Sequence, residues 1–146
     1  LRSPEWPDPT ADRGKHSIEY SLYPHQGRVL QGATIQRGYE YNTPLIGLIG
    51  SPGKGKLPMT HSFISLSPQN LILTSVKQAE DSNAWILQWY ETQGIETQAV
   101  LTLPLQPKSV VRSNVLEEDG MAATSVKNVV NITTDKNSIT TIKVLY

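Results

Sequence analysis

The chain has 146 residues, with 13 Lys and Arg against 13 Asp and Glu, so its formal net charge is zero. This balance argues against a nucleic-acid-binding protein and gives no reason to expect attraction to anionic membranes. The sequence holds no cysteine, which excludes disulfides, thiolate nucleophiles and zinc sites built on thiolates. No apolar stretch approaches the roughly 20 residues of a membrane span, and we interpret the start at Leu1 as a segment of a longer protein.

The first 60 residues predict little regular structure. Three prolines within residues 1–15 predict an irregular extended arm, because proline restricts both itself and its predecessor. From His16 to Tyr23 apolar and polar residues alternate, which predicts a strand with one buried face. Residues 28–41 would suit a short helix, although their two glycines disfavour it. The glycines and prolines of residues 50–58 predict an exposed loop.

From Thr60 onward the pattern is typical of short strands separated by turns. The predicted strands are His61–Leu66, Leu71–Lys77, Ala84–Thr92, Gln98–Leu105, Val110–Leu116, Asn128–Thr133 and Ser138–Tyr146. Residues 71–92 read as a β-hairpin that turns at residues 81–83, and Asp119-Gly120 reads as a further turn. Together these elements predict an all-β fold, an antiparallel β-sandwich with little helix.

Motifs for chemistry within the chain are weak. Residues 50–56 have the GxxxxGK spacing of a phosphate loop, but Leu57-Pro58 follow where a hydroxyl residue and a helix are needed. The histidines, His16, His25 and His61, lack the close spacing of a zinc site. We therefore predict no catalytic residue and no metal site in this chain.

The tryptophans of one predicted strand leave two alternatives open. Trp85 and Trp89 lie four residues apart and share a strand face. Burial in a sandwich core is the prediction for Trp89. An exposed Trp85 would instead suit the stacking of sugar rings, as in a stand-alone carbohydrate-binding module. An immunoglobulin-like spacer domain is a third reading that the absence of cysteine allows.

Four blocks of the sequence resemble glycoside hydrolase family 38, the α-mannosidases. The first block matches at Pro7, Asp8, Asp12, Gly14, His16, Tyr20, Leu22, Pro24 and His25. Tyr41–Leu45 looks like the family's N-x-P-L segment. Its K-x-A-E-D and Y-E-x-x-G patterns match at Lys77, Ala79, Glu80, Asp81, Tyr90, Glu91 and Gly94. Residues 115–118 and 139–142 resemble the closing strands, and we expect Lys77, Glu80 and Glu91 to bridge strands across the hairpin.

The resemblance implies a supersandwich-like, galactose-mutarotase-like region of a larger enzyme. Residues 1–60 would be the end of its large β-domain, and residues 61–146 its C-terminal β-sandwich. The parent would be a zinc-dependent retaining enzyme that hydrolyses terminal α-mannosides. Its zinc and its nucleophile would belong to an N-terminal catalytic domain of the same chain. This segment alone is predicted to be inactive and to hold no cofactor of its own.

The resemblance also indicates which residues would approach the α-mannoside substrate. Its first block lies toward the active-site side in the family, so the candidates for the rim of the substrate cleft are Arg2, Asp8, Asp12, Arg13 and His16. Charged side chains of this kind form charge-assisted hydrogen bonds to sugar hydroxyls. The alternative role for residues 12–14 is a turn with a local salt bridge. The expected location is the cytoplasm.

Overall fold

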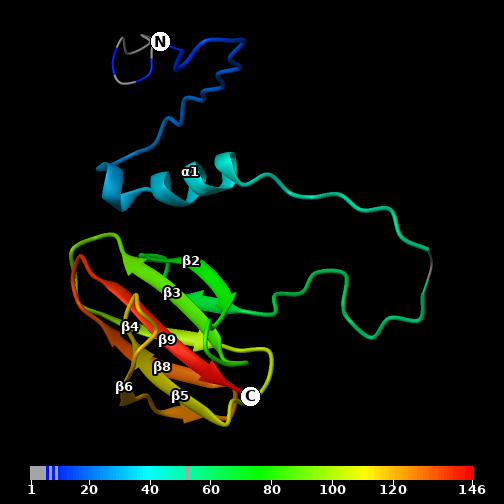
Figure 1. Ribbon diagram of the computed structural model, residues 1–146, viewed down its shortest axis with the longest axis vertical. Coiled ribbons are helices and arrows are strands. Elements are labelled where there is room, and N and C mark those ends of the chain that lie inside the picture. The colour runs from blue at the N-terminus through cyan, green and yellow to red at the C-terminus, as the bar shows by residue number, and fades with distance from the viewer. Residues whose placement is uncertain (1–5, 7, 9, 52) are drawn as a thin grey trace.

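The computed structural model of the protein describes residues 6, 8, 10–51 and 53–146. These residues form two unlike regions, which we call the arm (described residues of 6–63) and the sandwich (residues 64–146). The arm holds the 3-10 turn η1 (Val29–Gln31) and the helix α1 (Thr34–Asn42), with no strand among its described residues. Figure 1 shows the first part of the arm at one end of the molecule, α1 in the middle and the sandwich at the other end.

Strands of the sandwich pair in two antiparallel sheets. They are β1 (Ser65–Ser67), β2 (Leu71–Gln78), β3 (Trp85–Glu91), β4 (Thr97–Thr102), β5 (Ser109–Ser113), β6 (Asp119–Ala122), β7 (Ser125–Val126), β8 (Val129–Thr134) and β9 (Ile139–Leu145). One sheet has the strand order β1-β4-β8-β7, and the other has the order β2-β3-β9-β5-β6. This confirms the predicted all-β, antiparallel sandwich with little helix.

The core lies between the inner faces of the two sheets. Alternation along the strands sends every second side chain inward, as the buried 97, 99 and 101 positions of β4 show. The core cluster consists of Leu71, Leu87, Trp89, Ala99, Leu101, Leu103, Val110, Val130, Ile132, Ile142 and Val144. Because strands of both sheets contribute, each sheet buries its apolar face on the other.

The predicted hairpin and its turn are confirmed. β2 and β3 pair antiparallel from Leu71↔Glu91 to Gln78↔Trp85, with an irregularity between Leu73 and Ser75. Trp89 is fully buried, as predicted, and its Nε1 donates a 2.8 Å hydrogen bond to Thr134 Oγ1. That bond gives the polar edge of a buried indole the partner it needs.

Four predictions about individual elements are wrong or incomplete. The strand predicted at His61–Leu66 is only the short β1 (Ser65–Ser67). Residues 16–23 form no strand, since nothing among the described residues pairs with them. The predicted turn at Asp119-Gly120 is instead the start of β6, which pairs with β5. A Cβ on Gly120 would lie 3.0 Å from the carbonyl oxygen of Arg112, so glycine there permits a close approach of two strands. The predicted strand 110–116 ends at Ser113, and the residues after it form a loop.

α1 attaches to the end of the sandwich through polar side chains. None of its described side chains is fully buried. Gln36 Nε2 donates to the carbonyl oxygen of Gln69, and Gln93 Nε2 donates to that of Leu30 over 3.1 Å. Burial raises the pKa of Tyr90 to about 12, helped by a hydrogen bond with Tyr39 of the helix. The helix thus lies on the sandwich without sharing its core.

Candidate functional site

A buried carboxylate organises the turns at one end of the sandwich. Glu91 ends β3 and is only 3% exposed. It accepts hydrogen bonds from Asn70 Nδ2 and from the backbone N–H groups of Gln93, Gly94, Ile95 and Asn137, at 2.6 to 3.2 Å. We call this group the Glu91 node. It joins the residue before β2, the β3–β4 turn and the β8–β9 turn.

The local backbone of the Glu91 node is built to aim donors at the carboxylate. Gly94 and Asn137 both have positive φ, 74° and 51°, a conformation that glycine and asparagine tolerate best. Asn70 also donates to Thr97 Oγ1 over 2.7 Å, which fixes its amide. Burial alone would raise the pKa of Glu91, but the donors from Asn70 and the turn amides more than offset it and lower the pKa to about 2.

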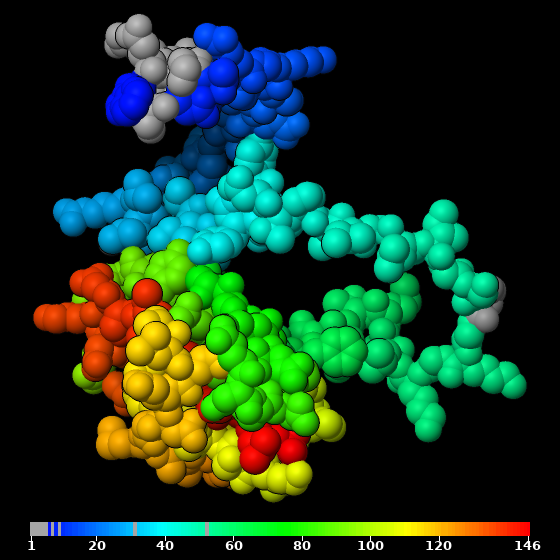
Figure 2. All heavy atoms as spheres, in the orientation of Figure 1, coloured from blue at the N-terminus to red at the C-terminus, as the bar shows by residue number. Residues whose placement is uncertain are grey.

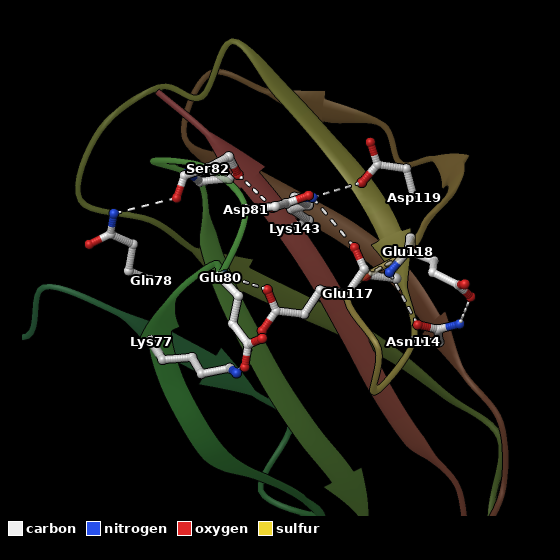
Figure 3. Close-up of polar contacts among 12 residues, drawn as sticks. Lys77, Gln78, Glu80, Asp81, Ser82, Asn114, Glu117, Glu118, Asp119 and Lys143 are labelled. Atoms are coloured by element: carbon white, nitrogen blue, oxygen red, sulfur yellow. Dashed lines mark hydrogen bonds and ion pairs between the residues drawn. The ribbon is translucent and has the colours of Figure 1, made fainter.

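A second polar cluster lies on the outer face of the five-stranded sheet (Figure 3). We call it the Lys143 network. Lys143 Nζ lies 3.1 Å from Asp81 Oδ1 and 3.2 Å from Asp119 Oδ1. It also donates a longer bond, 3.4 Å, to the carbonyl oxygen of Glu117. The largely covered ammonium of Lys143 in β9 thus ties the hairpin turn to the loop between β5 and β6.

Glu117 makes the other half of this network. Its Oε1 lies 2.6 Å from Lys77 Nζ, and its Oε2 accepts a 2.8 Å bond from the backbone N–H of Glu80. The hydrogen bond from Lys77 lowers the pKa of the Glu117 carboxyl, with the Glu80 amide as a second cause. The residue has a positive φ of 63°, so the loop bends sharply to bring its side chain inward.

These contacts settle the expectation for the family-motif residues Lys77, Glu80 and Glu91. The expectation holds only for Glu91, which accepts a hydrogen bond from Asn70 directly before β2; Lys77 and Glu80 contact the loop between β5 and β6 instead. Lys77 pairs with the β5–β6 loop, Glu80 takes part through its backbone, and Glu91 binds turn amides. Sequence reasoning missed Glu117 as the partner of Lys77 and of the Glu80 amide, because residues about 40 positions apart carry no local signal.

Four of the five rim candidates, Asp8, Asp12, Arg13 and His16, lie in the arm, away from both polar clusters. Arg2 is outside the described residues. Asp8 Oδ1 accepts bonds from the side chain and the backbone N–H of Thr10, and the Thr10 hydroxyl bond lowers the pKa of Asp8. His16 Nε2 lies 2.8 Å from the carbonyl oxygen of Asp12.

The turn at these residues matches the structural alternative in part. Asp12 has a positive φ of 58°, and the N–H of Arg13 donates to the carbonyl oxygen of Thr10. Asp12, Arg13 and His16 are exposed, and the described residues include no ion pair between them. Figure 2 shows this part of the arm as a separate mass on the far side of α1 from the sandwich.

The described residues do not fit a metal site. Among them, no group of three His, Cys, Asp or Glu side chains is placed to hold an ion. His25 stacks on Tyr23, and His61 meets the edge of Phe63. Trp85 is 36% exposed and contacts the ring of Tyr146 edge-on at 5.4 Å, so its use as a sugar platform stays a prediction. In the described part of the chain, no helix has the length and apolar character to cross a membrane.

The described carboxyl groups whose pKa is displaced all shift in the same direction. The carboxyl groups with a clear displacement, Asp8, Asp81, Glu91 and Glu117, all have a lowered pKa. A glycosidase acid needs a raised pKa, so that it still holds a proton near neutral pH. These four groups are therefore ionised acceptors and not proton donors.

Comparison with known proteins gives the family. The sequence model of the glycosyl hydrolases family 38 C-terminal beta sandwich domain matches residues 70–142. Alpha-mannosidase G of Dictyostelium discoideum is 35% identical over 133 residues, which are 87% of this chain and 12% of that protein. Alpha-mannosidase 2C1 of Homo sapiens is 36% identical over 121 residues, 80% of this chain and 11% of that protein. The alpha-mannosidase of Saccharomyces cerevisiae is 32% identical over 137 residues, 80% of this chain and 12% of that protein.

The matched residues contain most of the sandwich but stop one residue short of Lys143. They include the hairpin, the Glu91 node and the Lys77–Glu117 pair. The chain spans only about an eighth of the length of these relatives. The chain therefore belongs to glycosyl hydrolase family 38, in which it corresponds to the C-terminal β-sandwich domain.

Proposed function

We propose that this chain is the non-catalytic C-terminal β-region of a zinc-dependent retaining α-mannosidase. It packs on the catalytic domain of the same polypeptide and helps to shape the substrate cleft. The observation that carries the proposal is the match of the sandwich to the family's C-terminal domain, in relatives about eight times longer that are named alpha-mannosidases. The reaction, the release of terminal α-mannose, belongs to the whole polypeptide.

The chemistry of the described residues favours a structural, non-catalytic role. Retaining glycosidases need two carboxyl groups about 5–5.5 Å apart, one of them a proton donor. Here the buried carboxylate of Glu91 accepts hydrogen bonds from turn amides. The carboxylate of Glu117 is paired with Lys77 and accepts a hydrogen bond from a backbone amide. The described residues also fit no metal site, so we assign the zinc to the catalytic domain.

The domain boundary is part of the proposal. Residues 1–60 would end the large β-domain of the parent, and residues 61–146 would form the C-terminal sandwich. The first strand of the sandwich, β1, begins at Ser65. The core of the sandwich contains no described residue from before position 64. The arm therefore has no structural place in the sandwich core, as expected if its partners belong to another domain.

Rim contacts are assigned to Arg2, Asp8, Asp12, Arg13 and His16. The last four are exposed on the far side of α1, with carboxylate, guanidinium and imidazole groups that suit sugar hydroxyls. Asp12 and His16 are already held together through the Asp12 carbonyl. The predicted cytoplasmic location completes the proposal and is tested by fractionation of cells that produce the protein.

Two assays test whether this chain is inactive alone and whether it contributes to the substrate cleft of the longer enzyme. The 146-residue chain, incubated with an aryl α-mannoside and zinc, is expected to show no turnover, and measurable turnover would contradict the proposal. In the longer polypeptide that carries these residues, Asp12→Asn with Arg13→Ala is expected to raise KM with little change in kcat. The matched control is Asp135→Asn with Lys136→Ala, an exposed Asp–Lys pair in the β8–β9 turn. Equal kinetics for the two double variants would remove the rim assignment and leave the packing role standing.

A further inference from the structure

A polar groove lies on the outer face of the five-stranded sheet, next to the Lys143 network. Strands β2, β3 and β9 form its floor, and the loop between β5 and β6 forms one wall. Its volume is about 270 Å³. The lining includes Ser75, Lys77, Gln88, Val115, Glu117 and Thr141. Only the Lys77–Glu117 pair has a role in the contacts described above, so the remaining groups need an explanation of their own.

Three adjacent strands align polar side chains across the floor of the groove. In the register of the sheet, Ser75 pairs with Gln88, and Gln88 pairs with Thr141. Leu87 and Trp89 belong to the core, so Gln88 between them points outward, as do its neighbours in the row. Neighbouring strands lie about 4.8 Å apart, so the row extends over about 10 Å. It can therefore contact several groups of one small ligand.

This row has hydrogen-bonding capacity to spare. Gln88 Nε2 donates a 3.1 Å bond to Thr141 Oγ1, which leaves the side-chain carbonyl of Gln88 as an acceptor. Among the described residues no hydrogen bond involves the hydroxyl of Ser75, which can both donate and accept. The side chain of Lys77 is 49% exposed, and only one of its three donors is directed at Glu117. Donors and acceptors thus lie side by side, as a ligand rich in hydroxyl groups requires.

The charges that line the groove cancel. Lys77 and Glu117 form an ion pair, and Figure 3 shows their side chains meeting over the face of the sheet. The hydrogen bond with Glu117 raises the pKa of Lys77, and the charge of Glu80 contributes to the same shift. An anionic ligand would face two carboxylates beside this ammonium, and a cationic ligand would face the ammonium itself. The complementary ligand is therefore neutral.

Size and position favour one sugar ring over a peptide. Pockets for drug-sized ligands hold about 300–1,000 Å³, so this groove suits a smaller ligand. A peptide that joins a sheet pairs with a free edge through its main chain, whereas β3 and β9 have neighbours on both sides. A sugar ring carries hydroxyls at its rim and C–H groups on its faces. Val115, 76% exposed on the wall, gives such a face an apolar contact.

We propose that this groove binds one neutral sugar ring, with Ser75, Lys77 and Gln88 as its hydrogen-bonding groups. Mannose is the expected sugar. This choice rests on the proposed function, because the relatives are named alpha-mannosidases. The site needs neither a proton donor nor a metal, since binding breaks no bond.

Titration of the 146-residue chain with methyl α-mannoside, followed by the amide chemical shifts in NMR, tests the groove. The amides of residues 75, 77, 88 and 141 are expected to shift together and to saturate. For so small a ligand the expected Kd is on the order of 1 mM. Absence of a saturable shift at ten times that concentration would overturn the proposal. Saturable shifts that centre on Trp85, the alternative sugar platform, would also overturn it.

Two matched glutamines separate the groove from the rest of the surface. Gln88→Ala is expected to weaken methyl α-mannoside binding at least about 10-fold. Gln98→Ala is the control with unchanged affinity, since Gln98 Nε2 makes the same kind of bond, to Thr133 Oγ1, on the other sheet. Equal affinities would overturn the proposal. Should Gln88→Ala fail to fold, Ser75→Ala replaces it with about a 3-fold weakening, and Ser125→Ala, at another half-buried serine, is its control.

Lysine acetylation of the longer polypeptide, read by mass spectrometry, shows whether the groove is open there. Lys77 is expected to react, and methyl α-mannoside at its Kd is expected to slow this reaction about 2-fold while the exposed Lys127 is unaffected. An unreactive Lys77 without sugar would mean that another segment covers the groove, and would overturn the proposal. Turnover of an aryl α-mannoside by the 146-residue chain would contradict the proposed function alone, whereas absent binding would leave that function standing.

Discussion

The arm and the sandwich contain the same kinds of apolar residues and treat them in opposite ways. In the sandwich, apolar side chains such as Leu87, Leu101 and Ile142 lie in one contiguous buried cluster. In the arm, Leu45, Leu48 and Ile49 are almost wholly exposed. The difference does not arise from composition, since both regions carry strand-like patterns. In the sandwich two sheets cover the apolar faces of each other, whereas no described residue covers these side chains of the arm.

Polar contacts widen this difference. In the sandwich, Glu91 and Glu117 each hold segments far apart in sequence, by bonds to backbone amides and to Lys77. In the arm, the polar bonds of Asp8 and His16 reach only two and four residues along the chain. Local bonds order a turn but add nothing to a domain. The following substitutions test whether stability resides in the sandwich, beginning with the largest expected effect.

Removal of the central carboxylate is expected to be the most damaging change. Glu91→Ala leaves the amide of Asn70 and several turn N–H groups buried without their acceptor. The free energy of unfolding is expected to fall by at least about 3 kcal/mol, since each unpaired buried donor is costly. Urea unfolding measures the loss. Glu96→Ala, at an exposed position in the same turn, is the control with little effect, and a loss below about 1 kcal/mol for the Glu91 variant would refute the node.

Acid is expected to weaken the sandwich through the same residue. The pKa of Glu91 is about 2 in the folded chain against an ordinary value of 4.5, so its contribution is complete above pH 4.5 and is lost as the pH falls through 2. The shift corresponds to about 3 kcal/mol of unfolding free energy. Urea unfolding curves recorded at several pH values between 2 and 4.5 measure this loss of unfolding free energy. Glu91→Gln removes the titrating group, so its curve is expected to be flatter, and parallel curves would contradict the assignment.

Loss of the buried indole is expected to have an intermediate effect. Trp89→Phe opens space in the core and removes the bond to Thr134 Oγ1, at an expected cost of about 1–3 kcal/mol. Thermal unfolding followed by circular dichroism gives the difference. Trp85→Phe makes the same change at the partly exposed end of β3 and is expected to cost less than about 1 kcal/mol. Equal losses would mean that the core does not centre on Trp89.

The smallest expected effect is in the arm. Leu48→Ala in the 146-residue chain is expected to change the free energy of unfolding by less than about 0.5 kcal/mol, because the side chain has no neighbour to lose. The identical change at the fully buried Leu101 is expected to cost about 2–5 kcal/mol. Urea midpoints compare the two. A large loss at Leu48 would show that the arm belongs to the folded unit.

Sequence reasoning succeeded where the controlling interactions are local. Alternation between residues 71 and 92, broken by the short polar turn at 81–83, was enough to predict the β2–β3 hairpin. The same rule failed at residues 16–23, because alternation shows which face needs burial and not whether a partner is present. At Asp119-Gly120 the turn composition misled, since the glycine serves the close approach of Arg112 in a strand.

The polar clusters were predictable only in part. The family pattern drew attention to Lys77, Glu80 and Glu91, and all three lie in such clusters. Their partners were not predictable, because Glu117 reaches Lys77 from the loop between β5 and β6, about 40 residues further along the chain. The rim residues of the arm remain predictions, since their proposed ligand lies outside the contacts described.

The place of β9 has a consequence for synthesis. It is the last strand along the described chain, yet it lies between β3 and β5 in the middle of its sheet. A nascent chain on the ribosome therefore holds the neighbouring edges of β3 and β5 unpaired until residues 139–145 leave the exit tunnel, and exposed edges of this kind invite misassembly. A premature stop codon before residue 139 would not trim this domain but would split its larger sheet in two.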